Sequence, residues 1–279
     1  MNPCRVRDIP IGGDAPLVLL AGPCVVESRD LVFRTAEYLK EAARRHHIPL
    51  IFKASYEKAN RTSLSGFTGL GMDEALRILA DVSRAFDVPV VTDIHREQDA
   101  AVAAEAVHLL QIPAFLSRQT DLLLAAGRTG IAVNIKKGQF LAPEDMAHAA
   151  AKVASTGNDN ILLCERGTSF GYHNLVVDMR GLVVMRALGY PVVMDATHAV
   201  QIPSQGEASG GRPEFILPLA RAAVATGIDA LFVETHPDPP TAFSDAASQL
   251  PLRMIDELLA QVLAIDEAVR SRTSDPGVV

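Results

Sequence analysis

The feature that most constrains the fold is an alternation of short apolar runs with amphipathic segments along the whole chain. The apolar runs are rich in Val, Ile and Leu, and a polar turn follows each of them. Continuous apolar runs of this length are typical of parallel strands that are buried on both faces. There are eight such runs, at residues 17–21, 50–53, 90–93, 108–112, 131–135, 161–164, 192–195 and 230–234.

Helix-like segments separate these runs, at residues 29–45, 73–86, 143–155, 214–226 and about 251–270. Ser28 can cap the first of them, and Gly227 can stop the fourth. Strict alternation of strands and helices predicts a parallel α/β sheet. Eight strands in 279 residues match a closed (β/α)₈ barrel, the TIM-barrel architecture.

An open doubly wound sheet is the alternative, but the chain lacks its glycine fingerprint after the first run, where it reads Ala21-Gly22-Pro23-Cys24. We expect one catalytic domain over residues 1–270 and a disordered tail at 271–279. We also expect a short N-terminal hairpin across the bottom of the barrel, formed by residues 6–11 and the segment from Leu17 onward.

The amino-acid composition limits the classes of binding partner and the compartment that we expect. Lys and Arg number 26 against 33 Asp and Glu, so the net charge is −7. This balance gives no bulk attraction to nucleic acid or to an anionic membrane, and we expect neither as a partner. Three cysteines make a disulfide framework improbable and indicate a reducing compartment. Without a signal-peptide pattern or a spanning segment, the sequence predicts a cytoplasmic protein.

Charged side chains gather directly after the predicted strands, where barrel enzymes carry their reactive residues. The cations in this set are Lys53, Lys58, Arg61, Lys136 and Arg166. Any one of them alone is best explained as a solvated surface charge. Five at strand ends, in a protein of net negative charge, indicate a site for phosphate or carboxylate groups.

A second set at the strand ends combines soft and hard metal ligands: Cys24, His198, Glu234 and Asp245. A thiolate, an imidazole and two carboxylates suit Fe²⁺, Zn²⁺, Co²⁺ or Mn²⁺. Ligands from different strands leave no spacing signature, so spacing alone is a weak signal. The simpler alternative keeps Cys24 as a small buried apolar residue.

Several long motifs closely resemble those of the 3-deoxy-D-manno-octulosonate 8-phosphate synthase family. They are KASYEKANRTS (53–63), PAFLSRQT (113–120), VNIKKGQF (133–140), ERGTSFGY (165–172), DATHAVQ (195–201) and FVETHP (232–237). The resemblance covers about residues 5–270. It implies a (β/α)₈ barrel that is usually a homotetramer. It also implies a transferase that condenses phosphoenolpyruvate, D-arabinose 5-phosphate and water and releases phosphate, on the route to the inner sugar of lipopolysaccharide.

The resemblance also implies roles for individual residues. Cys24 marks the metal-requiring branch of the family, with Cys24, His198, Glu234 and Asp245 as ligands. The implied phosphoenolpyruvate site comprises Lys53, Ser55, Lys58, Gln111, Lys136 and Arg166. The implied arabinose 5-phosphate site comprises Asn60, Arg61, Thr62, Asp93 and, from a neighbouring subunit, Arg118. The expected catalytic residues are Lys58, Lys136, His198 and Asp245.

Two other functions compete with this prediction. A related barrel enzyme, 3-deoxy-D-arabino-heptulosonate 7-phosphate synthase, uses erythrose 4-phosphate and typically has Lys-Pro-Arg-Thr where this chain has Lys58-Ala-Asn-Arg-Thr62. A barrel that only binds a sugar phosphate would leave the cation and metal sets without a purpose. We further expect residues 199–212, a long glycine-rich connection after His198, to be a lid over the site.

Overall fold

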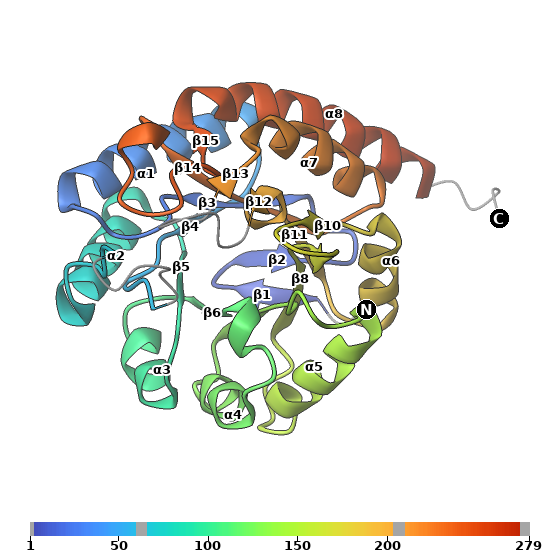
Figure 1. Cartoon of the computed structure of the whole chain (residues 1–279), viewed down its shortest axis with the longest axis horizontal. Helices are drawn as coiled ribbons and strands as arrows, with labels where there is room; N and C mark the ends of the chain where they lie inside the picture. The colour runs from blue at the N-terminus through green and yellow to red at the C-terminus, as the bar shows by residue number, and fades with distance from the viewer. Residues whose placement is uncertain (1–2, 60–65, 203–209, 274–279) are drawn as a thin grey trace.

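In the computed structural model, which describes residues 3–59, 66–202 and 210–273, eight parallel strands form a closed barrel (Figure 1). Strand β11 pairs with both β8 and β14, and β14 pairs with β3, so the eight barrel strands close on themselves, while β15 (Leu250–Pro251) pairs with the end of β14. This confirms the predicted (β/α)₈ barrel and excludes the open doubly wound sheet. The barrel strands are β3 (Val18–Gly22), β4 (Leu50–Lys53), β5 (Val90–Asp93), β6 (Leu109–Ile112), β7 (Ala132–Lys136), β8 (Ile161–Glu165), β11 (Val192–Asp195) and β14 (Ala230–His236).

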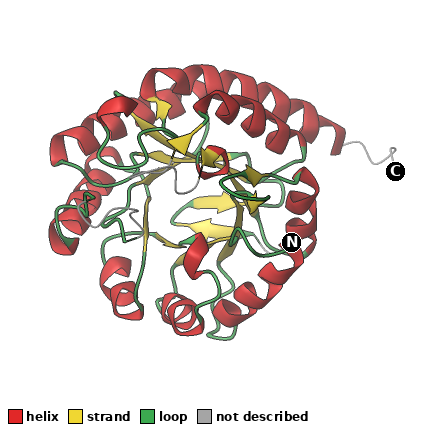
Figure 2. Cartoon of the chain, in the orientation of Figure 1, coloured by secondary structure: helices red, strands yellow, loops and turns green. Residues whose placement is uncertain are grey.

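Helices surround the barrel as an outer ring (Figure 2). Ser28 caps the first helix through its side chain, as predicted. None of the described helices combines the length and the hydropathy that a membrane-spanning segment needs. The helices are α1 (Arg29–His46), α2 (Met72–Phe86), α3 (Glu97–Ala104), α4 (Thr120–Arg128), α5 (Met146–Ala154), α6 (Met179–Ala187), α7 (Ile216–Ala225) and α8 (Ile255–Thr273).

Three of the predicted helices begin later in the structure than expected. The segments expected at 143–155, 214–226 and about 251–270 each open with a short 3₁₀ turn, η2 (Pro143–Asp145), η4 (Pro213–Phe215) and η6 (Leu252–Met254), before the α-helix begins. A proline stands at or just before the start of each turn, because proline fixes φ and its missing N–H is tolerated there. Helix α8 continues to Thr273, and residues 274–279 of the expected tail lie outside the described residues.

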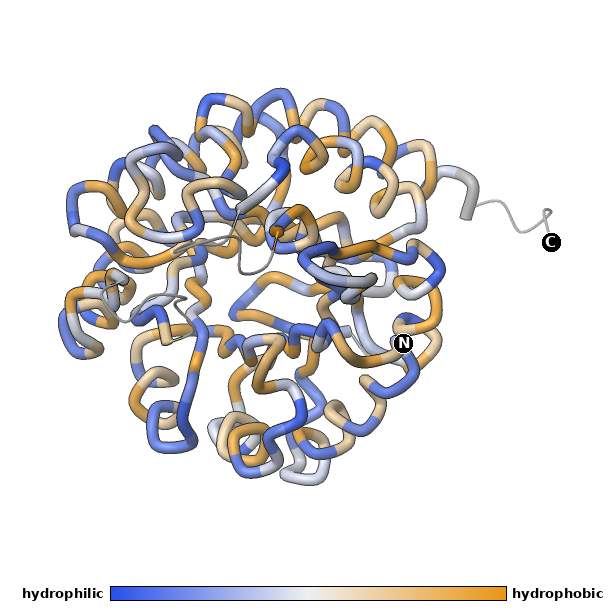
Figure 3. The backbone as a smooth tube through the Cα atoms, in the orientation of Figure 1, coloured by the Kyte–Doolittle hydropathy of each residue, from blue (hydrophilic) through white to orange (hydrophobic). Residues whose placement is uncertain are grey.

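Two apolar layers hold the architecture together. Alternate residues of each strand face outward and pack against the helices, as Leu19 and Phe52 do. The others, including Leu20, Ile51 and Phe232, fill the lower interior of the barrel. Figure 3 shows the complementary pattern on the helices, whose turns alternate between hydrophobic and hydrophilic residues. Both faces of the strands are buried, which is why the strands read as continuous apolar runs.

The N-terminal hairpin exists, but the predicted pairing was wrong. Its strands are β1 (Cys4–Val6) and β2 (Ile9–Ile11), whereas the segment from Leu17 onward leads into barrel strand β3. The turn falls at Arg7 and Asp8, and Arg7 has a φ of 53°. Cys4, Val6 and Ile11 are buried against the interior cluster and close the amino end of the barrel.

Candidate active site

The alternation of side chains along the strands carries the polar residues of the site into the upper barrel. Ile51 and Phe232 belong to the interior cluster, so Lys53 and Glu234, two residues further along, face the same interior. These two side chains are buried and form an ion pair in which Lys53 Nζ lies 2.5 Å from Glu234 Oε1. The same parity directs five further polar side chains inward: Asp93, Gln111, Asn134, Lys136 and Asp195.

A cavity of about 160 Å³ opens at the carboxyl end of the barrel. Seven predicted site residues line it: Ser55, Lys58, Asp93, Lys136, Arg166, His198 and Glu234. Lys53 and Gln111 are buried and contact lining residues. Arg118 is exposed on the turn after η1 (Ala114–Leu116) and is not among the described residues that line the cavity. The predicted residues Asn60, Arg61 and Thr62 lie outside the described residues.

A chain of buried hydrogen bonds crosses four neighbouring strand ends. The Asn134 amide donates to Gln111 Oε1 at 2.9 Å, and Gln111 Nε2 donates to Asp93 Oδ1 at 2.5 Å. The Ser55 hydroxyl donates to the other Asp93 oxygen. Burial opposes ionisation of Asp93, but the charges of Lys53 and Lys136 outweigh it and hold the pKa of this carboxyl well below its usual range.

Asp195 orients two of the predicted catalytic residues. Its Oδ2 lies 2.7 Å from Lys136 Nζ and 2.7 Å from His198 Nδ1. Although Asp195 is buried, the charges of His198 and Lys136 keep the pKa of its carboxyl well below its usual range. This network assigns the proton to His198 Nδ1, which donates to Asp195 and leaves Nε2 available as a ligand. His198 Nε2 lies 3.7 Å from Glu234 Oε1 and 3.9 Å from Asp245 Oδ2.

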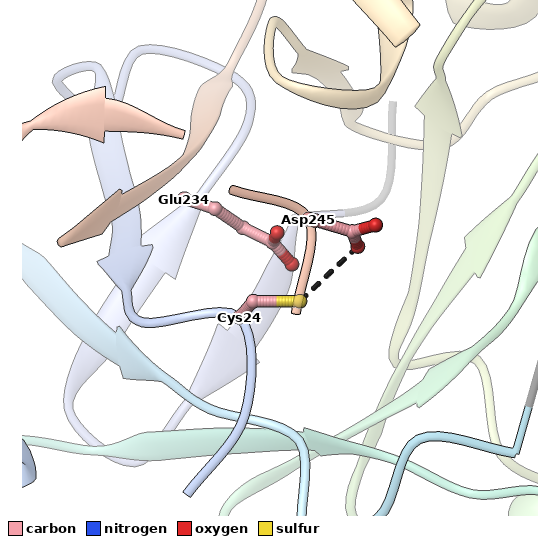
Figure 4. A group of neighbouring side chains, drawn as sticks. All are labelled: Cys24, Glu234 and Asp245. Carbon is pink, nitrogen blue, oxygen red and sulfur yellow. Dashed lines mark hydrogen bonds between the residues drawn. The ribbon is translucent and has the colours of Figure 1, made fainter. Parts of the chain in front are cut away.

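Three of the four predicted metal ligands form one cluster. Ligand atoms of Cys24, Glu234 and Asp245 lie within 4.8 Å of one another, and their side chains converge in Figure 4. The Cys24 thiol donates to Asp245 Oδ2 at 3.1 Å. Glu234 Oε2 is buried and has no hydrogen-bond partner among the described residues. With His198 Nε2 beside them, these sulfur, nitrogen and oxygen atoms fit a divalent transition metal.

Lysines balance the charge of this cluster. Lys53 Nζ also donates to the backbone oxygen of Cys24 at 2.8 Å, and Lys58 Nζ lies 3.2 Å from Asp245 Oδ2. Burial, reinforced by the carboxylates of Asp245 and Glu234, raises the pKa of the Cys24 thiol well above its ordinary value. Burial opposes ionisation of Asp245 as well, but Lys58 and His198 bring the pKa of this carboxyl well below its usual range.

Two glycines permit close backbone contacts around the cluster. A Cβ on Gly22, the last residue of β3, would meet the backbone oxygen of Lys53 at 1.9 Å. A Cβ on Gly211 would meet the backbone oxygen of Ala247 at 2.4 Å. Gly211 belongs to β13 (Gly210–Gly211), which pairs with β12 (Gln201–Ile202) at the two ends of the predicted lid, and residues 203–209 lie outside the described residues.

Several polar residues in or beside the site were not among the predicted site residues. Gln139 and His95 line the cavity, and they follow strands β7 and β5. Lys137 follows Lys136 and therefore points to the outer face of the barrel, where it is fully buried. Its Nζ lies 3.5 Å from Glu165 Oε1 and donates to Thr168 Oγ1 at 2.9 Å. Gln201 accepts a hydrogen bond of 2.9 Å from Arg166 Nη2. Gln139, Lys137 and Gln201 lie within the conspicuous motifs of the sequence, and His95 lies two residues after Asp93, so these positions were the available signal.

Comparison with known proteins assigns the family. A model described as the DAHP synthetase I family matches residues 2–271. The 2-dehydro-3-deoxyphosphooctonate aldolase of Syntrophotalea carbinolica is 56% identical over 270 residues, which cover 96% of this chain and 98% of the relative. Proteins of the same name from Acidithiobacillus ferrooxidans (55% over 269 residues; 96% of both chains) and Koribacter versatilis (54% over 273 residues; 96% and 98%) are similarly close. The chain therefore belongs to the 2-dehydro-3-deoxyphosphooctonate aldolases, also called 3-deoxy-D-manno-octulosonate 8-phosphate synthases, of the DAHP synthetase I family.

Proposed function

We propose that this protein condenses phosphoenolpyruvate with D-arabinose 5-phosphate and water, giving 3-deoxy-D-manno-octulosonate 8-phosphate and phosphate. The product supplies the inner sugar of lipopolysaccharide. The observation that carries the proposal is the union of buried cations with a cluster of metal-ligand side chains at one barrel mouth, in a chain whose named relatives are 2-dehydro-3-deoxyphosphooctonate aldolases.

The reaction forms a carbon–carbon bond between the methylene carbon of phosphoenolpyruvate and the sugar aldehyde. Water then adds to the cationic carbon that carried the phosphate, and phosphate leaves. Two anionic substrates must lie together, and two unit charges 4 Å apart repel by about 4 kcal/mol in a partly buried site. Lys53, Lys136 and Arg166 offset this repulsion and orient phosphoenolpyruvate. Asp93 accepts a hydrogen bond from a hydroxyl group of the sugar.

A divalent metal, Fe²⁺, Zn²⁺, Co²⁺ or Mn²⁺, would be held by Cys24, His198, Glu234 and Asp245. Such an ion polarises a carbonyl oxygen or lowers the pKa of a bound water. The chain itself orients the ligands, because Asp195 accepts a hydrogen bond from His198 Nδ1–H and Lys58 forms an ion pair with Asp245. Lys58 and Lys136 also line the cavity, so their ammonium groups can donate hydrogen bonds to a bound substrate.

Phosphate release tests the proposal directly. The protein is incubated with phosphoenolpyruvate and, separately, arabinose 5-phosphate, erythrose 4-phosphate or no sugar. We expect release with arabinose 5-phosphate, loss after chelation, and recovery when Mn²⁺, Co²⁺, Fe²⁺ or Zn²⁺ is added. A preference for erythrose 4-phosphate would support the heptulosonate synthase instead, and binding without release would support a sugar-phosphate-binding barrel.

We also propose a homotetramer in the cytoplasm. Phe115, Phe140, Phe170 and Tyr172 are exposed in the connections after β6, β7 and β8, which are neighbouring strands, and exposed large apolar side chains favour self-association. Arg118, exposed beside Phe115, would reach the sugar phosphate of a neighbouring subunit. Mixed tetramers of Arg118→Ala and Arg61→Ala subunits should then recover activity that neither parent has. The three free thiols agree with a reducing compartment.

A further inference from the structure

Two buried titratable side chains lie next to the metal-ligand cluster without lining the cavity. Glu27 is 7% exposed and His236 is 3% exposed, and neither is among the described residues that line the cavity. Their closest approach is 3.7 Å, between Glu27 Oε2 and His236 Nε2. A buried carboxylate facing a buried imidazole is costly to maintain without a role, so the pair calls for an explanation.

The backbone contacts of the pair settle its orientation. Glu27 Oε1 accepts a hydrogen bond from the backbone N–H of Phe243 at 3.0 Å. His236 Nδ1 accepts one from the backbone N–H of Asp238 at 3.0 Å. Because Nδ1 is an acceptor, the ring proton of neutral His236 resides on Nε2, the atom that faces Glu27. His236 Nε2 has no hydrogen-bond partner among the described residues, and it lies 3.7 Å from the Glu27 carboxylate.

The pair and its backbone contact join the three segments that carry the cluster. Glu27 lies three residues after Cys24, and His236 lies two residues after Glu234. Phe243, whose N–H the Glu27 carboxylate accepts, lies two residues before Asp245. On the far side of Asp245, the Ser248 N–H donates to the Asp245 backbone oxygen at 3.0 Å, and Asp245 itself adopts a φ of 50°. An anchor at Phe243 therefore limits where the Asp245 carboxylate can lie.

We propose that Glu27 and His236 are a positioning pair that holds the Cys24, Glu234 and Asp245 segments at the separation a divalent metal requires. The inference rests on the proposed metal dependence of this enzyme. Neither residue touches substrate or metal. Groups that orient metal ligands in this way typically contribute 10- to 100-fold to metal affinity.

The test measures Co²⁺ affinity by titration against a competing chelator, together with the thiolate–Co²⁺ absorption band. Glu27→Ala removes the contacts to both His236 and Phe243, so we expect Co²⁺ binding to weaken by about 10- to 100-fold and the band to change. The matched control is Glu41→Ala, which removes an exposed carboxylate of α1 that pairs with Arg44 and should leave affinity and band unchanged.

A pair of histidine variants separates positioning from a general loss of packing. Gln at position 236 can still present an N–H toward Glu27, whereas Asn reaches only as far as the Nδ1 position. We expect His236→Gln to retain more Co²⁺ affinity than His236→Asn. In active variants kcat should fall while KM for phosphoenolpyruvate stays close to the wild-type value, because the substrate cations are untouched.

The outcomes distinguish this inference from the proposed function. If wild-type protein binds no divalent metal, the metal assignment fails, and this inference fails with it. If wild-type protein binds Co²⁺ and folded Glu27→Ala binds it within twofold of wild type with an unaltered band, only the positioning pair is overturned. Should Glu27→Ala not fold, equal affinities of His236→Gln and His236→Asn overturn it, and a gap between them supports it.

Discussion

The two ends of the barrel are built from the same eight strands and have opposite character. At the amino end, the interior is apolar and is closed by the hairpin residues Cys4, Val6 and Ile11. At the carboxyl end, the interior holds buried ion pairs such as Lys53–Glu234 and Lys136–Asp195. Both ends are buried, so burial alone does not separate them. Burial of apolar groups stabilises the fold, whereas burial of charges costs stability and prepares chemistry.

Function and stability are therefore separable along a single strand. In β14, Phe232 fills the interior and Glu234, two residues later, joins the metal-ligand cluster. In β4, Ile51 and Lys53 show the same change over the same distance. Substitutions at the two ends should therefore affect different measured quantities.

The largest effect is expected at the carboxyl end for Cys24→Ala. Loss of the thiolate removes one ligand of the proposed metal, whose chemistry contributes several kcal/mol. We expect kcat/KM to fall by about 10²- to 10³-fold and the metal content measured by elemental analysis to fall with it. The thermal midpoint should change little, since a small buried side chain is replaced by a slightly smaller one. Full activity in metal-free Cys24→Ala protein would contradict the division between the ends.

At the amino end, Ile11→Ala should produce the reverse pattern. Ile11 is fully buried against the barrel interior, and such truncations typically destabilise by about 2–5 kcal/mol. Chemical denaturation should detect this loss, while kcat and both KM values per folded molecule stay at wild-type levels. Ile11→Val is the matched control, with an expected cost of about 0.5–1.5 kcal/mol. A changed KM in folded Ile11→Ala would show that the hairpin communicates with the site.

Arg166→Lys tests whether a cation of the site acts through charge alone. Arg166 is buried and donates one guanidinium N–H to Gln201 at 2.9 Å, and its Nη1 has no hydrogen-bond partner among the described residues. Lysine keeps the charge but not the planar fork that binds phosphate through two parallel contacts. We expect KM for phosphoenolpyruvate to rise by about 10-fold or more, with a smaller change for arabinose 5-phosphate. Equal changes for both substrates would argue against the assignment of Arg166 to phosphoenolpyruvate.

The smallest expected effect concerns Asp93 and pH. The pKa of this carboxyl is lower in the folded protein than in the unfolded chain, so its ionised form stabilises the fold. That contribution is complete above the pKa of Asp93 in the unfolded chain, about 3.9. It is lost as the pH falls from there toward the lower pKa of Asp93 in the folded protein. Asp93→Asn should therefore be less stable than wild type at pH 7. Denaturation at several pH values should show the gap shrinking below about pH 4, and a gap that grows there would contradict the sign.

Sequence patterns predicted the fold more accurately than the bounds of its parts. Eight apolar runs correspond to the eight barrel strands because strands buried on both faces need continuous apolar sequence. The hairpin pairing was wrong, since Leu17 can extend a hairpin or enter the barrel with equal local preference. The pairing of the hairpin is decided by the burial of Ile11 and Cys4 beneath the barrel. There the Asn160 side chain accepts a hydrogen bond from the Arg5 N–H at 2.6 Å and donates one to the Arg5 C=O at 2.8 Å.

The site was predictable in its chemistry and only partly in its geometry. The strand ends carry cations and metal-ligand side chains, and the structure gathers Lys58, Lys136, Arg166 and His198 around one cavity. Lys137 shows the limit of such reasoning. It neighbours Lys136 in the chain, yet strand alternation turns it to the opposite face, where it lies near Glu165 and supports a loop.

The sequence by itself determined the order of strands and helices, the parity that turns polar side chains inward, and the supply of cations and ligands. These properties are local, because each depends on residues a few positions apart. Only the tertiary structure decided which strand ends become neighbours. Cys24 and Asp245 are 221 positions apart and meet because β14 pairs with β3 on one side and β11 on the other. Closure of the barrel also brings Glu27 to His236, a contact that no local pattern encodes.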